Sequence, residues 1–331
     1  MPRIFLTHPP AALETYYGAR ALAALRAVAL VRINPLPREL SVEELTDAAQ
    51  DCALVISYRQ TPGPAELFER MPGLVAFSRC AIDIRNIDVA AASRAGVLIT
   101  QASAGFTAAV SEWTIGAMLD LSRNLTSMTM AYHAGQVPAA TMGRELRGAT
   151  LGLIGYGQIG RYLCKLALPF GMRVLVSDPY AKVDDAALTQ VDFSELLATA
   201  DYVVCLAVAN EETEILMNEA AFAAMKPGAY FINPSRGNLV DEAALKRALD
   251  GQRLAGCALD VGRAPDQMPT PALARHPKVI ATPHLGGLTP AAIEHQALET
   301  VSQAAEILAG RAPMGAVNAA QATRLTRLAT P

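Results

Sequence analysis

The chain has 331 residues, of which 52% are hydrophobic and 18% are charged, and its formal net charge is −3 at pH 7. This length is sufficient for two domains, each with its own core. The small net charge gives no electrostatic reason to bind nucleic acid, and no apolar stretch is long enough to span a bilayer, so we expect neither a nucleic-acid nor a membrane partner.

Cysteine usage and the first residues predict a cytoplasmic protein. The chain begins with a predicted strand and has no signal-peptide pattern. Its five cysteines lie in apolar runs without the spacing of a metal site or a disulfide framework, which is typical of buried thiols: Cys52, Cys80, Cys164, Cys205 and Cys257. Histidines and acids near the motifs below do not recur at ligand spacing, so we expect no metal.

Short apolar runs alternate with helical patterns along the chain, which is typical of parallel sheets. The first predicted strands are residues 3–6, 28–33, 53–57, 74–77 and 97–100. Residues 108–130 then form a predicted helix that is apolar on most sides, which indicates burial between domains or subunits. The second series of strands is residues 150–154, 173–177, 202–206, 229–233, 254–259 and 279–282. A last predicted helix, residues 290–309, returns to the first domain, and we expect a flexible tail after it.

The first strand of the second series runs directly into Gly155, Gly157 and Gly160, spaced as Gly-x-Gly-x-x-Gly. In this motif the glycines permit a tight turn, a close approach of the backbone to a pyrophosphate, and close packing of the following helix on the strand. Asp178 ends the next strand, where a carboxylate accepts hydrogen bonds from the adenosine ribose and repels the extra phosphate of NADP. The combination predicts an NAD site.

The sequence therefore predicts an α/β protein with two doubly wound parallel-sheet domains. A Rossmann NAD-binding domain, residues 102–286, is inserted into a discontinuous, flavodoxin-like substrate domain formed by residues 1–101 and 287–331.

Three further segments follow strands of the second series, at the sheet edge where α/β proteins bind ligands. Arg236 lies beside a glycine, and its planar fork can bind a carboxylate in two parallel hydrogen bonds, with a salt bridge at the sheet edge as the alternative. Asp260 can orient the nicotinamide end of a cofactor or act as a helix N-cap. His284 lies between a proline and a glycine pair and is suited to acid/base catalysis, with a structural role as the alternative. We interpret the other histidines as structural or solvated.

The order of these motifs resembles that of the D-isomer-specific 2-hydroxyacid dehydrogenase family, and the likeness covers most of the chain. Besides the glycine motif and Pro283-His284, the matching segments are Asn86 to Ala92, Val110 to Trp113, Met225 to Gly228, Asn233 to Gly237 and Leu259 to Val261. The resemblance implies that Arg236 binds the carboxylate of a 2-oxo acid and that His284 donates a proton during reduction and accepts it during oxidation.

The same resemblance implies further contacts. Gln158 and Ile159 lie on the pyrophosphate, and Pro234, Asp260 and His284 lie near the nicotinamide. The loop of Tyr58, Arg59 and Gln60 resembles the family's substrate loop, whose backbone N–H groups bind the substrate carboxylate. Arg59 adds a charge that could select a substrate with a second acidic group, or it could be a solvated surface arginine. Together with the apolar helix, the resemblance predicts a homodimer.

One position departs from the family pattern. The family has a glutamate before a proline that hydrogen-bonds the histidine, and alignment of the prolines places Ala264 there. Asp266 could substitute for this carboxylate, Gln267 could orient the imidazole without charge, or His284 could act unaided. We expect an NAD-dependent oxidoreductase that interconverts a small D-2-hydroxy acid and its 2-oxo acid; the alternative, which the missing glutamate favours, is an NAD(H)-responsive binding or regulatory module with a dehydrogenase fold.

Overall fold

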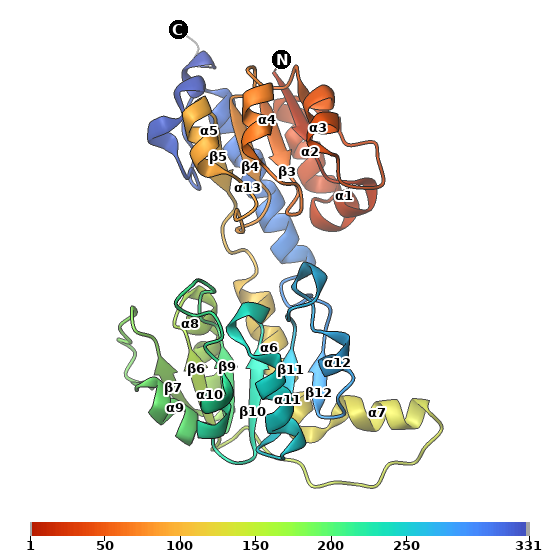
Figure 1. Ribbon diagram of the computed structural model, residues 1–331, viewed down its shortest axis with the longest axis vertical. Helices are drawn as coiled ribbons and strands as arrows, with labels where there is room; N and C mark the ends of the chain where they lie inside the picture. The colour runs from red at the N-terminus through yellow and green to blue at the C-terminus, as the bar shows by residue number, and fades with distance from the viewer. Residues whose placement is uncertain (1, 329–331) are drawn as a thin grey trace. The chain divides into compact units, whose positions relative to one another are not determined.

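The computed structural model describes residues 2–328, apart from the side chain of Asp266. The chain forms two compact units, which we call unit 1 (Met1–Gly105 with Pro290–Pro331) and unit 2 (Phe106–Thr289). Each unit contains its own parallel sheet with helices around it (Figure 1). The predicted fold class of two doubly wound parallel-sheet α/β domains is thereby confirmed.

The sheet of unit 1 has strand order β2-β1-β3-β4-β5, and all its strands are parallel. The strands are β1 (Arg3–Leu6), β2 (Leu30–Ile33), β3 (Leu54–Ser57), β4 (Ala76–Arg79) and β5 (Leu98–Gln101). The helices are α1 (Pro10–Tyr16), α2 (Ala19–Val28), α3 (Val42–Ala49), α4 (Ala65–Arg70), α5 (Val89–Ala95) and α13 (Pro290–Leu308). Helices α2 and α13 pack on one face, and α3, α4 and α5 pack on the other. Because β1 lies between β2 and β3, the loops after β1 and β3 diverge at the point where such sheets bind ligands.

The sheet of unit 2 has strand order β12-β11-β10-β9-β6-β7-β8 and is also parallel. The strands are β6 (Thr150–Ile154), β7 (Arg173–Ser177), β8 (Leu188–Gln190), β9 (Tyr202–Cys205), β10 (Ala229–Asn233), β11 (Leu254–Leu259) and β12 (Val279–Ala281). The α-helices are α6 (Thr107–Arg123), α7 (Leu125–His133), α8 (Gln158–Ala167), α9 (Phe193–Thr199), α10 (Glu219–Ala224), α11 (Glu242–Asp250) and α12 (Pro271–Ala274). Sequence analysis missed β8, because only the first of its three residues is buried and it has no apolar run.

The prediction of one buried helix over residues 108–130 was wrong in its second half. Asn124 adopts the left-handed conformation, with φ of 55°, and separates α6 from α7. Asparagine tolerates this conformation, and the Asp120 carboxylate accepts a 2.8 Å hydrogen bond from the Thr126 N–H in the first turn of α7. Helix α6 is largely buried against the sheet, whereas α7 contains no buried residue.

The prediction of a flexible tail after residue 309 was also wrong for the described residues. The Val317 N–H donates to the Ile99 carbonyl at 2.9 Å, and Leu325 is buried in the core of unit 1. The Asn318 side chain accepts from the Ile99 N–H and donates to Ser93 and to the Val97 carbonyl. Sequence analysis missed this segment because side-chain hydrogen bonds to the edge strand β5 leave no periodic pattern.

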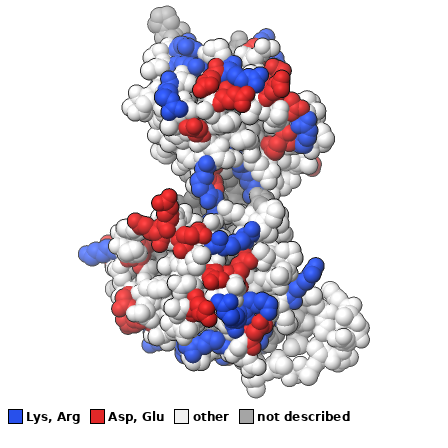
Figure 2. Space-filling model, viewed as in Figure 1, with Lys and Arg blue, Asp and Glu red and all other residues white. Residues whose placement is uncertain are grey.

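The described helices include none with the length and hydropathy of a membrane span. On the face viewed in Figure 2, basic and acidic side chains are interspersed over both units.

We predict that Asn318→Ala destabilises the protein by about 2–4 kcal/mol, because it leaves the Ile99 N–H and the Val97 carbonyl without their buried partner. Chemical denaturation of the two proteins measures this difference. The matched control is Gln321→Ala, at an exposed position of the same segment, where we expect a change below about 0.5 kcal/mol. Equal stability of both variants would contradict the docking of this segment.

Candidate functional site

The glycine motif forms the tight turn between β6 and α8. Gly155 has φ of +96°, and a Cβ added there would lie 2.7 Å from the backbone of Leu206. A Cβ added at Gly160 would lie 2.6 Å from the Gly155 carbonyl oxygen. Neither position accepts a side chain. At Gly157, by contrast, no described atom lies within 4 Å of the added Cβ, so the space beside this backbone is open.

The N-terminus of α8 is suited to hold a phosphate. The helix begins at Gln158, and its N-cap residue Gly157 has no side chain that could accept a hydrogen bond from the first-turn N–H groups. First-turn N–H groups, such as those of Gln158 and Ile159, have no partner within a helix, and the helix dipole favours an anion at this end. The open space at Gly157 and these donors fit the pyrophosphate of a dinucleotide.

Asp178 follows β7 and stabilises the glycine turn. Its carboxylate accepts backbone hydrogen bonds from Tyr156 at 2.6 Å and from Tyr180 and Ala181 at 2.8 Å each. Burial raises the pKa of this carboxyl, but these donors and the charge of Arg161 together hold the pKa below its ordinary value. Because a carboxylate has about four acceptor positions, it can still accept a hydrogen bond from a ribose hydroxyl. The residues of this motif therefore fit NAD.

Arg236 follows β10 in a loop that a buried asparagine holds in place. The Asn233 side chain accepts from the Ser235 N–H at 3.1 Å and donates to the Arg236 carbonyl at 2.9 Å, and both partners follow the buried Pro234. A Cβ at Gly237 would collide with the Gly262 backbone, so the loop after β10 lies directly against the loop after β11. The half-buried Arg236 side chain donates to the Ser235 carbonyl at 2.8 Å.

Asp260 connects the end of β11 to the segment that carries His284. Its buried carboxylate accepts from the Thr282 hydroxyl at 2.6 Å and from the N–H groups of Leu285 at 2.8 Å and Gly286 at 2.7 Å. The Asp260 carbonyl accepts from the His284 N–H at 2.9 Å, and His284 adopts a left-handed backbone with φ of 55°. Asp260 is therefore not a helix N-cap; it holds the backbone segment that carries the half-buried His284.

The loop after β11 contains the position of the departure from the family pattern. Backbone hydrogen bonds join Gly262 to Gln267 at 2.8 Å and Ala264 to Met268 at 3.0 Å. Gln267 has φ of 57°, and its side-chain oxygen is buried without a partner among the described residues. The side chain of Asp266 lies outside the described residues. Among the described residues, the Gln267 side-chain oxygen therefore does not orient the His284 imidazole.

In unit 1, the predicted substrate loop follows β3. The Tyr58 ring is buried, with its centroid 5.1 Å from the His8 ring and 5.4 Å from the Tyr16 ring. The half-buried Arg59 guanidinium lies 5.4 Å from the centroid of the Tyr16 ring. Gln60 is exposed.

Sequence analysis missed two residues next to this loop. Arg79, at the end of β4, is completely buried, and Asn86 hydrogen-bonds both its guanidinium and the loop. His8, directly after β1, fits the structural role that is one of the two predicted for it. It is buried, and both of its ring nitrogens have no partner among the described residues. A charged residue that ends an otherwise apolar strand was the available signal for Arg79.

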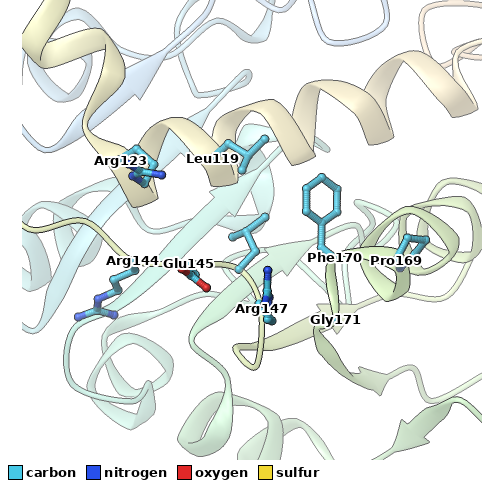
Figure 3. Close-up of a pocket in the computed structure, with 9 residues that line it drawn as sticks. Leu119, Arg123, Arg144, Glu145, Arg147, Pro169, Phe170 and Gly171 are labelled. Carbon is cyan, nitrogen blue, oxygen red and sulfur yellow. The ribbon is translucent and has the colours of Figure 1, made fainter.

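A separate pocket of about 570 Å³ lies in unit 2 (Figure 3). It lies between the end of α6, the segment before β6 and the turn after α8, and none of the predicted site residues lines it. Arg144, which lines this pocket, donates to the Gly228 carbonyl at 3.0 Å and lies over the Tyr230 ring, so its charge serves local packing.

His8 makes the stability of the protein depend on pH. Burial and, to a smaller extent, the Arg79 charge lower the pKa of His8 to about 3, from 6.5 in the unfolded chain. The unfolded state therefore binds a proton that the folded state rejects, and stability falls as the pH drops from 6.5 toward 3. For this group alone we predict a loss of about 2 kcal/mol in the free energy of unfolding between pH 7 and pH 5.

The measurement compares urea denaturation of the wild type and His8→Leu at these two pH values. The pH-dependent loss should be smaller by that amount in the variant. His133→Leu, which removes an exposed histidine, is the control and should retain the wild-type dependence. An unchanged dependence in His8→Leu would contradict a neutral buried His8.

Comparison with known proteins identifies the family. Residues 115–286 match the model of the D-isomer specific 2-hydroxyacid dehydrogenase, NAD binding domain. The chain is 37% identical over 263 residues to (S)-sulfolactate dehydrogenase from Chromohalobacter salexigens, a match that covers 78% of this chain and 83% of that protein. It is 34% identical over 286 residues to D-3-phosphoglycerate dehydrogenase 3 from Arabidopsis thaliana, covering 85% of this chain and 49% of that protein.

The chain thus spans about half the length of the phosphoglycerate dehydrogenases that it matches. Among solved structures, the TT0316 protein from Thermus thermophilus superposes with a TM-score of 0.84 at 30% identity, over 95% of this chain and 99% of that one. The chain therefore belongs to the D-isomer-specific 2-hydroxyacid dehydrogenase family, an NAD-dependent family of oxidoreductases, and unit 2 contains the family's NAD-binding domain.

Proposed function

We propose that the protein interconverts a small D-2-hydroxy acid and its 2-oxo acid in an NAD-dependent reaction. The observation that carries this proposal is the connection of the Arg236 and His284 loops. Gly237 lies against Gly262, and Asp260 binds the segment of His284, so a carboxylate-binding group after β10 and a proton-transfer group after β12 are joined through the loop after the strand between them, β11. The dinucleotide motif lies at the same edge of the same sheet, since all these residues follow carboxyl ends of parallel strands.

The proposed reaction uses three side chains of unit 2. Arg236 binds the substrate carboxylate through its fork and polarises the neighbouring carbonyl group. His284 donates a proton to the carbonyl oxygen during reduction and removes the hydroxyl proton during oxidation. Bound NAD supplies hydride transfer to or from the substrate carbon. Asp260 acts through His284, because its carboxylate binds the backbone segment that carries this histidine.

The cofactor contacts follow from the turn after β6. We propose that the N–H groups of Gly157, Gln158 and Ile159 bind the pyrophosphate and that Asp178 binds the adenosine ribose. Pro234 and Asp260 are proposed to lie near the nicotinamide end. These assignments are supported by the open space at Gly157 and by the remaining acceptor capacity of the Asp178 carboxylate.

We propose that unit 1 is the substrate domain and that Tyr58, Arg59 and Gln60 contact the substrate. Two relatives are named after sulfolactate and phosphoglycerate, and each of these compounds carries a second acidic group. Arg59 places a positive charge in this loop. A substrate with a second acidic group is therefore the preferred candidate.

We also propose that the protein is a homodimer in the cytoplasm. From Asn124 to Gly143 the chain contains no charged residue, and this segment exposes large apolar side chains: Leu125, Met130, Tyr132, Val137 and Met142. In Figure 2 the part of unit 2 that corresponds to α7 is uncharged on the viewed face. A second copy of the chain suits such a surface, since an uncharged apolar patch of this kind typically marks a protein interface. Buried free thiols at all five cysteines support the cytoplasmic location, which cell fractionation tests.

The catalytic proposal is tested with NADH oxidation against a panel of 2-oxo acids. The panel includes glyoxylate, pyruvate and hydroxypyruvate and, with a second acidic group, oxaloacetate, 2-oxoglutarate and sulfopyruvate. We predict that Arg236→Lys lowers kcat/KM by about 100-fold or more, because lysine cannot form two parallel hydrogen bonds, and that His284→Gln lowers kcat at least as much.

Arg275→Lys is the matched control, since this arginine is exposed at the end of α12. It should retain wild-type kinetics. NADH affinity should be unchanged in Arg236→Lys. Tight NADH binding by a wild type that reduces no member of the panel would contradict the enzyme and support an NAD(H)-responsive binding module.

The dimer is tested by sedimentation. We predict that Met130→Glu with Tyr132→Glu converts a dimer into a monomer, because two carboxylates would have to be desolvated in an apolar interface. Leu30→Glu, at an exposed apolar residue of unit 1, is the control and should leave the mass unchanged. A monomeric wild type would contradict the proposal.

A further inference from the structure

Arg236 is directly followed by a short 3₁₀ turn, Gly237–Leu239, which is bound to a neighbouring loop. The N–H groups of Ile215 and Met217 each donate at 2.8 Å to a carbonyl of this turn. Both donors belong to the segment between β9 and α10, on a neighbouring strand of the sheet. The position of the turn, and with it the backbone from which the Arg236 side chain extends, therefore depends on this segment.

Arg263, in the loop after β11, binds the same turn. Its guanidinium donates to the carbonyls of Asn238 at 2.9 Å and Val240 at 3.1 Å, and to the Glu214 carboxylate at 2.8 Å. The planar guanidinium has five donors in fixed directions, so it can bind three acceptors from different segments at once. One side chain thus joins the loops that follow β9, β10 and β11.

The groups on both sides of this connection are themselves held in place. The Glu214 carboxylate also accepts from the Asn238 side chain at 3.1 Å, and the hydrogen bonds from Arg263 and Asn238 hold the pKa of Glu214 below its ordinary value. The Arg263 N–H donates to the Glu242 carboxylate at 3.0 Å, and this carboxylate also accepts from the Thr270 hydroxyl at 2.7 Å. Both the backbone and the side chain of Arg263 are therefore fixed.

Ile215 has a strained backbone, which the same contacts enforce. It adopts the left-handed conformation with φ of 57°, in which its Cβ lies close to the following carbonyl oxygen. A β-branched residue rarely adopts this conformation, and it persists only where surrounding contacts impose it. Here those contacts are the hydrogen bond from the Ile215 N–H to Asn238 and the adjacent ion pair between Glu214 and Arg263. Loss of the ion pair would allow the segment to relax and to release the turn after Arg236.

We propose that Arg263 is a positioning residue that holds Arg236 in place for the substrate carboxylate, an inference that rests on the function proposed above. Arg263 and Glu214 fix the turn after Arg236 and offset the strain at Ile215. Arg263 does not itself bind substrate, because its guanidinium is bound to two carbonyls and its charge is paired with Glu214. It directly precedes Ala264, the position where this chain departs from the family pattern.

The first test removes the arginine. Because a displacement of about 1 Å at a site can lower activity about 100-fold, we expect Arg263→Gln to lower kcat/KM for the best 2-oxo acid about tenfold or more, chiefly through KM. Arg263→Lys keeps the charge beside Glu214 but cannot bind both carbonyls in one plane, and it should cost about threefold. Arg247→Gln is the matched control, since it removes an exposed 2.8 Å ion pair with Glu219 in the same unit, and it should retain wild-type kinetics.

The second test is a rescue, which separates positioning from a general loss of stability. Glycine adopts a positive φ without strain, so Ile215→Gly alone should keep wild-type kinetics. Combined with Arg263→Gln, it should recover about threefold or more of the lost kcat/KM, because the segment no longer needs the ion pair to hold its conformation. Gln252→Gly is the matched control, since Gln252 has the same φ of 57° in the turn before β11. It should give no recovery.

A further readout does not depend on turnover. Oxalate is titrated calorimetrically into the NADH complex of each protein, because its carboxylates require only the clamp and no proton transfer. We expect its Kd to rise about tenfold in Arg263→Gln and to recover in the double variant with Ile215→Gly. Arg263→Lys carries the same comparison if Arg263→Gln does not fold.

The outcomes separate the two proposals. In a wild type that turns over, kcat/KM of Arg263→Gln within about twofold of the Arg247→Gln control would overturn the inference and leave the reaction in place, and so would a defect that Ile215→Gly does not relieve. A wild type that reduces no 2-oxo acid but binds oxalate more tightly than Arg263→Gln refutes the reaction and supports the positioning of Arg236. A wild type that neither reduces a 2-oxo acid nor binds oxalate overturns both.

Discussion

The Asp260 carboxylate is the interaction on which the arrangement of unit 2 depends. It is buried at the end of β11, and it accepts hydrogen bonds from one hydroxyl and two N–H groups of the segment from Thr282 to Gly286. Hydrogen bonds to a charged acceptor are the stronger kind, and leaving this carboxylate unpaired in the interior would cost several kcal/mol. The segment therefore has one favoured conformation, and His284 is held within it in a left-handed backbone.

Glycines provide the complementary constraint, because they allow backbones to approach where a side chain would prevent it. The loop of Arg236 reaches the loop of Asp260 at Gly237, where an added Cβ would collide with the Gly262 backbone, and β6 reaches the first turn of α8 at Gly160, where an added Cβ would collide with the Gly155 carbonyl. A β-carbon at any of these contacts would separate groups that the proposed chemistry needs together. Close packing of the loops and the hydrogen bonds of Asp260 thus both hold the segments of Arg236 and His284 at one edge of the sheet.

In unit 1 the loop after β3 is held in a different way. Its loop after β3 is fixed from behind by a buried guanidinium and an amide, so the loop is held by its carbonyl groups and not by its own side chains. This leaves the identity of the loop side chains open to variation without loss of the backbone arrangement. It also explains why a fully buried arginine ends the strand β4, a position where an uncompensated charge would otherwise be costly.

The sequence by itself determined the fold class, the strands of both sheets except β8, and the residues of the glycine motif and of the Arg236 and His284 segments. These depend on local features: apolar runs of strand length, glycines at fixed spacing, and polar residues directly after strands. Only the tertiary structure decided that Asp260 binds the segment of His284, that Arg79 and Asn86 hold residues 58–61, and that Asn318 docks the last segment on β5. Those interactions join residues far apart in the chain, and their hydrogen bonds depend on three-dimensional geometry that composition and periodicity do not contain.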